Sequence, residues 1–155
     1  MVEDARFEDG IARPLRLIAE SAEDVVVLSG LAQDAVFVLS EASWQTDKRR
    51  FAILINRFRW EDHAPSKPPE RARVLLVFDD VTHVASQGLD RNDPEMVMSL
   101  LSIVWSPGAD SAGRFELVLA GDGAIAVDAE CVNVTLQDVT RPYLAPSGKT
   151  PEHPK

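Results

Sequence analysis

The chain has little of what disulfide-linked or metal-bound folds require, because its 155 residues include one cysteine and three histidines. Cys131 cannot form an internal disulfide, which fits a reducing compartment, and we expect a cytoplasmic protein. His63, His83 and His153 form no ligand-spaced motif, so neither a metal site nor a cofactor is predicted. Folding must therefore depend on a hydrophobic core, for which the chain is long enough.

Long hydrophobic runs are also missing from the sequence. Its apolar runs, such as residues 25–28 and 51–55, fall far short of the roughly 18 residues of a membrane-spanning helix. The first ten residues are acidic and lack the apolar segment of a secretory signal peptide. The sequence therefore predicts a protein without a membrane segment.

Positive charge is scarce and unevenly distributed. The net charge of -9 argues against a nucleic-acid-binding protein, because binding to phosphates normally needs a basic surface. Residues 48–73 nevertheless hold eight basic and three acidic residues, a net charge of +5, whereas the remainder of the chain has a net charge of -14. An acidic protein with one basic segment is the most unusual feature of this composition.

One helix is predicted, over residues 22–35. Ser21 is suited to cap its N-terminus, and the acidic residues Glu23 and Asp24 follow where the helix dipole favours negative charge. Apolar side chains recur at helical spacing and would form one stripe: Leu28, Leu31, Ala32 and Ala35.

The rest of the chain has the periodicity of strands. Alternating apolar residues on both sides of Gly121-Asp122-Gly123 predict a β-hairpin. Residues 129–139 fit either a strand with a bulge near Cys131 or a helix. We expect an α+β fold, in which a mainly antiparallel, strongly bent or barrel-like sheet of about seven strands packs against the helix. Strands are predicted over residues 15–19, 36–41, 50–60, 73–86 with a bend near 79–80, 96–105, 115–119 and 124–129.

A single domain is predicted over residues 14–140. Residues 1–13 are polar and aperiodic and suggest a flexible leader, and the proline-rich residues 141–155 suggest a tail. Three prolines make residues 63–70 a loop.

The most distinctive stretch is residues 48–62, KRRFAILINRFRWED. Its first half is apolar on both faces of a strand, whereas Arg57 and Arg59 would bring one face of the second half to the surface. These arginines either pair with surface acids or form a strip that binds a protein or an anionic ligand. The predicted strip comprises Arg49, Arg50, Arg57, Phe58, Arg59 and Trp60.

A second hypothesis places a small-molecule or enzymatic pocket at one end of the barrel. Residues from different strands would meet there, and no sequence motif would reveal such a site. The candidates are Asn56, Arg57, Asp79 and His83.

No catalytic residues are predicted, because the sequence lacks a nucleophile-elbow motif and Cys131 has no cation beside it to lower its pKa. The two glycines of AGDGA are explained by the hairpin turn, since the lysine of a phosphate-binding loop is absent. We therefore favour a non-enzymatic interaction or regulatory module, acting as a monomer or as a homodimer through a sheet edge.

Five segments give the chain a resemblance to a known family: LSGLAQDAV (28–36), RRFAILINRFRWED (49–62), QGLD (87–90), GAIAVDAECV (123–132) and PEH (151–153). The chain resembles a family of small alphaproteobacterial proteins of unknown function, in which the arginine-flanked strand is the most specific element. The resemblance implies a bacterial, cytoplasmic, single-domain protein and supplies no activity or catalytic residue.

Overall fold

The computed structural model describes residues 15–59, 70–139 and 143–144, the last two by their backbone. These ranges contain one α-helix, α2 (Ala22–Ala32), ten strands of three or more residues, and one strand of two. The strands are β1 (Arg16–Ala19), β2 (Val36–Val38), β3 (Ala42–Gln45), β4 (Arg50–Phe58), β5 (Glu70–Phe78), β6 (Val81–Gln87), β7 (Val97–Pro107), β8 (Gly113–Leu119), β9 (Ala124–Ala129), β10 (Val134–Asp138) and β11 (Tyr143–Leu144).

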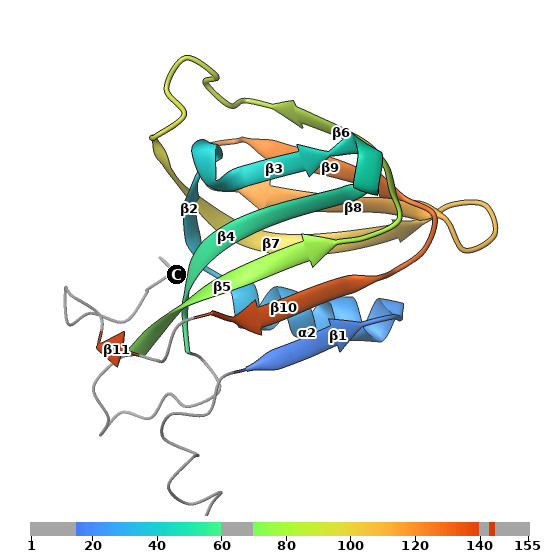
Figure 1. Cartoon of the computed structure of the whole chain (residues 1–155), viewed down its shortest axis with the longest axis horizontal. Coiled ribbons are helices and arrows are strands. Elements are labelled where there is room, and N and C mark those ends of the chain that lie inside the picture. The colour runs from blue at the N-terminus through green and yellow to red at the C-terminus, as the bar shows by residue number, and fades with distance from the viewer. Residues whose placement is uncertain (1–14, 60–69, 140–142, 145–155) are drawn as a thin grey trace, which may run out of the picture.

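The strands form one antiparallel sheet that folds over into two layers, with α2 beside it (Figure 1). Strands β1, β10, β5 and β4 form one layer, and β7, β8, β9 and β6 form the other. The short strand β2 joins the layers, because it pairs with both β4 and β7. The predicted antiparallel sheet with one helix is confirmed. The predicted strand number was too low, and the sheet does not close into a barrel.

Two of the additional strands have separate explanations: one segment was not predicted as a strand, and one predicted strand is divided in two. Strand β3 occupies residues between the predicted strands at 36–41 and 50–60, and it pairs with the first half of β4. Residues 73–86 form two strands instead of one bent strand, because Asp80 adopts a left-handed backbone conformation with φ of 59°. A left-handed residue cannot continue a strand, and aspartate is among the side chains that tolerate it.

The helix begins as predicted and ends three residues early. The Asp24 backbone N–H donates to the Ser21 hydroxyl at 3.2 Å, which confirms the N-cap. At the other end Asp34 is left-handed, and its N–H donates to the Leu100 carbonyl on β7 at 2.8 Å. Pairing of residues 34–35 with β7 therefore replaces the last helical turn.

The predicted hairpin is confirmed as β8 and β9, with Gly121 and Asp122 in the left-handed conformations that its turn needs. Residues 134–138 form a strand, which excludes the helical alternative for them. Strand β10 does not continue the hairpin through a bulge, because it pairs with β5 and β1 in the other layer. The chain therefore passes from the second layer to the first near Cys131, where the sequence analysis allowed a bulge.

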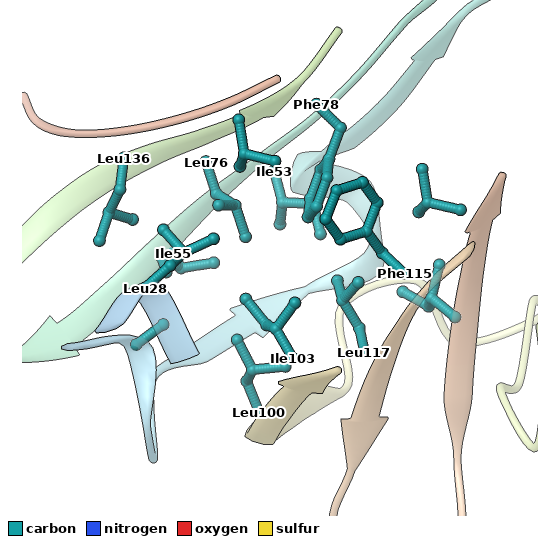
Figure 2. Close-up of a cluster of buried hydrophobic side chains, with 14 of the residues drawn as sticks. Leu28, Ile53, Ile55, Leu76, Phe78, Leu100, Ile103, Phe115, Leu117 and Leu136 are labelled. Carbon is teal, nitrogen blue, oxygen red and sulfur yellow. The ribbon is translucent and has the colours of Figure 1, made fainter. Parts of the chain in front are cut away.

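The core lies between the two layers (Figure 2). Ile55 and Leu76 of the first layer face Ile103 and Leu117 of the second, and Leu28 of α2 closes the space between them. Phe78 and Phe115 meet edge to face, with ring centroids 5.0 Å apart. Full burial of such side chains stabilises a fold by about 1.5 to 3 kcal/mol each.

Several predicted segments lie outside the described residues: the leader at 1–13, residues 63–69 of the loop, and all but two residues of the tail. Among the described helices, none is long and apolar enough to cross a membrane.

Candidate functional site

The arginine-flanked strand is not the exposed surface that the sequence predicts. Arg57 and Phe58 are completely buried and Arg59 is 5% exposed, so the expectation that this half of the strand reaches the surface was wrong. Alternation does place Arg57, and Arg59 just beyond the end of β4, on one face, but that face continues the buried row of Phe51, Ile53 and Ile55. Trp60 lies outside the described residues.

Burial of Arg57 is made tolerable by Asp138, a residue 81 positions further along the chain. The Arg57 Nε donates to Asp138 Oδ1 at 3.2 Å, and both side chains are fully buried. Asp138 also accepts the Leu15 backbone N–H at 2.7 Å, and it donates its own N–H to the Leu15 carbonyl at 2.9 Å. We call Arg57, Asp138 and Leu15 the clasp, because together they fasten β4, β10 and the residue that precedes β1.

The other arginines of the predicted strip also have carboxylate partners. Arg50 contacts Asp79 at 2.8 Å, Arg59 contacts Glu70 at 3.4 Å, and Arg49 contacts Glu130. Hydrogen bonding to Glu130 raises the pKa of Arg49. Arg49 and Arg50 retain about half of their side-chain exposure, with 46% and 43% accessible. Their predicted role in binding stays a prediction.

The four residues of the predicted pocket are not brought together. Arg50 and Asp79 meet at one end of β4, whereas Arg57 lies seven residues away, about 23 Å along an extended strand. Asn56 points to the opposite face of β4 from Arg57 and accepts a hydrogen bond from Arg71. His83 is exposed on β6 in the second layer.

A different site lies where the sheet fails to close. Within the described residues β3 pairs only with β4, and β6 pairs only with β9. The gap between these two strands, which we call the seam, is visible near the top of Figure 1. It is pinned at one corner, where the Val81 N–H donates to the Arg49 carbonyl at 2.9 Å.

The seam contains a hollow of about 350 Å³, which we call the seam hollow. Its floor includes Phe51 and Ile125, which are buried members of the core. Other apolar walls are only partly buried, so the core reaches the surface here. The lining residues are Leu39, Ala42, Trp44, Phe51, Val84, Ala85, Ser86, Leu89, Arg91 and Ile125.

Two glycines allow Leu89 to cover one side of the seam hollow. A Cβ on Gly123 would lie 3.1 Å from Leu89 Cδ2, and a Cβ on Gly88 would lie 3.0 Å from Gly123 Cα. Gly88 is also left-handed, with φ of +72°. The loop after β6 therefore turns sharply and packs on the β8–β9 turn.

The same loop places Arg91 at the seam hollow. Asp90 accepts the Asn92 backbone N–H at 2.9 Å, an Asx turn that fixes the loop just before and after Arg91. The Ser40 N–H donates to the Pro94 carbonyl at 3.0 Å and fastens the far end of the loop beside β3. Arg91 Nη2 itself lies 3.4 Å from Ser86 Oγ.

The pinned corner of the seam holds a small polar cluster. Asp80 accepts hydrogen bonds from the Asn133 amide at 3.1 Å and from the Cys131 thiol at 3.5 Å. The Asn133 and Cys131 donors, with Arg49 nearby, lower the pKa of Asp80. Burial, followed by the adjacent Asp80, raises the pKa of Cys131, which favours the protonated thiol over the nucleophilic thiolate.

Metal-binding groups do not gather anywhere in the described ranges, where no three histidine, cysteine or acidic side chains are arranged to hold an ion. A second hollow, of about 320 Å³, lies between α2 and β7 and is lined by Val25, Val26, Ile103, Val104 and Trp105 with small neighbours. None of the described residues that line it is charged.

Sequence reasoning missed the seam hollow, although part of its signal was present. Val84 and Ile125 alternate as expected for strands, but only strand pairing shows that β3 and β6 each have one partner among the described strands. Trp44 lies in a segment that the periodicity did not identify as a strand.

The match to a known family covers residues 15–153. The chain belongs to the family described as protein of unknown function, DUF2948. The resemblance to a family of unknown function is thus confirmed, and the matched range includes the clasp and every residue of the seam hollow. No curated protein and no solved structure matches the chain.

Proposed function

We propose that this chain is a binding protein for small, largely apolar molecules and that its site is the seam hollow. The observation that supports this most is an opening of the hydrophobic core at a gap in the sheet, with about 350 Å³ of space. Small-molecule sites are concave, mostly apolar and about 300 to 1,000 Å³ in volume. The seam hollow has this character.

Binding is favoured over catalysis by the chemistry of the lining. The described residues of the walls include no carboxylate, imidazole or thiol, the groups that usually carry acid–base or nucleophilic catalysis. Ser86 and Arg91 are the polar side chains. They suit the orientation of a ligand, which is the usual role of the few polar groups in an apolar pocket.

The test uses a neutral apolar probe, 1-naphthalenemethanol, titrated into isotope-labelled protein and followed by amide NMR shifts. We expect saturable shifts around Trp44, Val84 and Ile125, and loss of these shifts in Trp44→Ala. Val26→Ala, in the second hollow, is the matched control and should bind as the parent does. Shifts that are scattered over the surface, or that survive in Trp44→Ala, would count against the proposal.

A second candidate function is an interaction module that uses Arg49 and Arg50, whose side chains remain about half exposed. Alanine substitution of Arg57 and Arg59 would not test it, since both are buried. The informative variant is Arg49→Gln with Arg50→Gln, compared with Arg114→Gln, in pull-downs from the native host. A partner lost only from the double variant supports an interaction through these arginines, and identical captures contradict it.

A bacterial and cytoplasmic setting, which the family resemblance implies, is part of the proposal. Detection of the tagged protein in the soluble fraction of a bacterial host that encodes it would support this part, and recovery from the envelope fraction would overturn it.

A further inference from the structure

We infer that the ligand of the seam hollow carries a carboxylate beside its apolar body and that Arg91 binds this group. The inference rests on the proposed function, because it names the chemistry of the molecule bound there. It goes beyond that function by assigning Arg91 as the residue that determines specificity.

The charge of the seam hollow comes from Arg91, which has no carboxylate partner among the described residues. Among the described residues that line the seam hollow, Arg91 alone is charged. Asp90, Asp93 and Glu95 are close in sequence, yet none of the described carboxylates forms an ion pair with Arg91. By contrast, five other described arginines each have a carboxylate partner: Arg49, Arg50, Arg57, Arg59 and Arg114.

The geometry leaves the guanidinium group of Arg91 available to a ligand. Its one hydrogen bond with a described residue is the 3.4 Å contact with the Ser86 hydroxyl, a weak one at that distance. The group has five N–H donors in a planar fork, which matches the two oxygens of a carboxylate. In the part of the chain that the structure describes, no lysine or second arginine lines the site to compensate a more highly charged group.

The walls define the rest of the ligand. Trp44 and Phe51 are opposite each other on paired strands and offer aromatic surface, and Leu89 adds an aliphatic side. The volume is near the lower end of the range for small-molecule sites. A compact aromatic or aliphatic carboxylate suits this space.

The net charge of the protein cannot itself explain a preference for carboxylates. At -9 the molecule as a whole repels anions, so preference for a carboxylate must come from a short-range contact. Arg91→Gln and Arg114→Gln change the net charge equally. Arg114 is paired with Asp128 on the surface, away from the seam hollow, so it separates the local effect from the global one.

The experiment measures the affinities of three naphthalene probes of similar size at 0.15 M salt, by NMR titration of the full chain. The probes are 1-naphthoate, neutral 1-naphthalenemethanol and cationic 1-naphthylmethylammonium. We expect 1-naphthoate to bind about tenfold more tightly than the neutral probe, a ratio that corresponds to ~1.4 kcal/mol. Arg91→Gln should bring the ratio to one, Arg91→Lys should retain part of it, and Arg114→Gln should leave it unchanged.

The outcomes separate the two claims. Equal binding of the anionic and neutral probes, or a preference that persists in Arg91→Gln, would overturn the carboxylate inference while the seam hollow remained a binding site. Tighter binding of the cationic probe would overturn it as well. Absence of saturable binding by every probe would remove the proposed function and this inference with it.

Discussion

Arg57 in the clasp and Arg91 at the seam hollow are the same residue type in opposite surroundings. Arg57 is fully buried against Asp138, in an ion pair that joins β4 to β10, and Asp138 also holds the Leu15 backbone. Arg91 is exposed, and its one described partner is the Ser86 hydroxyl. A buried charge destabilises the folded protein unless it has a partner, whereas an exposed charge without an ion pair can bind a ligand.

The basic segment also has a different role from the one that its composition suggests. Its concentration of positive charge suggests a binding surface, but the structure uses Arg57 and Arg59 inside the protein. Arg91 lies in a loop with three acidic neighbours in sequence and gives no compositional signal. Clustering of charge along the chain is therefore a poor guide to which charge meets solvent.

The largest effect is expected when the clasp loses one partner. Arg57→Met should lower the free energy of unfolding by about 3 to 5 kcal/mol, because Asp138 is left buried without its cation. Urea denaturation of the variant and the parent measures this difference. The double variant Arg57→Met with Asp138→Asn should recover part of the loss, since it buries no unpaired charge and retains an acceptor for Leu15. A single variant as stable as the parent would contradict the clasp.

A smaller loss of stability is expected at the seam hollow. Trp44 is half-buried, so Trp44→Ala should cost roughly half of the 3 to 5 kcal/mol typical of a buried large aromatic, or about 2 kcal/mol. Phe115→Ala, in the middle of the core, is the comparison and should cost the full amount. Thermal and urea denaturation give both values. Equal losses for the two variants would show that Trp44 is a core residue and not a wall of an open site.

Asp80, at the pinned corner of the seam, should make the stability of the protein depend on pH in the acidic range. The folded-state pKa of Asp80 lies below its ordinary value of 3.8, so its stabilising effect is complete above about pH 4 and is lost as the pH falls through the folded pKa. Asp80→Asn keeps a side chain that tolerates the left-handed backbone, and it should make stability decline less steeply below pH 4.

Urea titrations between pH 2.5 and 7 measure this slope. Asn133→Ala removes the amide donor that contributes most to lowering the pKa of Asp80, so it should flatten the slope in the same direction. Parallel stability curves for the parent and both variants would exclude the Asp80 cluster as a source of the dependence.

The smallest effect is expected at Gly123, against which Leu89 packs. In Gly123→Ala the new methyl group would lie 3.1 Å from Leu89 Cδ2, which a flexible side chain relieves by moving a few tenths of an ångström. We expect little change in the melting temperature but weaker binding of 1-naphthoate, because Leu89 moves from the wall. Gly30→Ala, where nothing lies within 4 Å, is the control and should leave binding unchanged. Unaltered affinity in Gly123→Ala would show that Leu89 does not shape the site.

Local features were predictable because a few neighbouring residues decide them. The Ser21 cap depends on Asp24 three positions on, and the β8–β9 turn depends on the left-handed Gly121 and Asp122. The candidate site was not predictable in this way. Residues 39 to 125 contribute to the seam hollow, and its opening exists because two strands that are far apart in the chain fail to pair.

By itself, the sequence determined an antiparallel α+β fold with one capped helix and one tight hairpin, since periodicity and turn chemistry act over a few residues. Only the tertiary structure decided that Arg57 is buried, because its counter-charge arrives from 81 positions away through the pairing of β10 with β5 and of β5 with β4. It also decided that the core opens between β3 and β6, because closure of a sheet depends on strand register and length in the whole molecule.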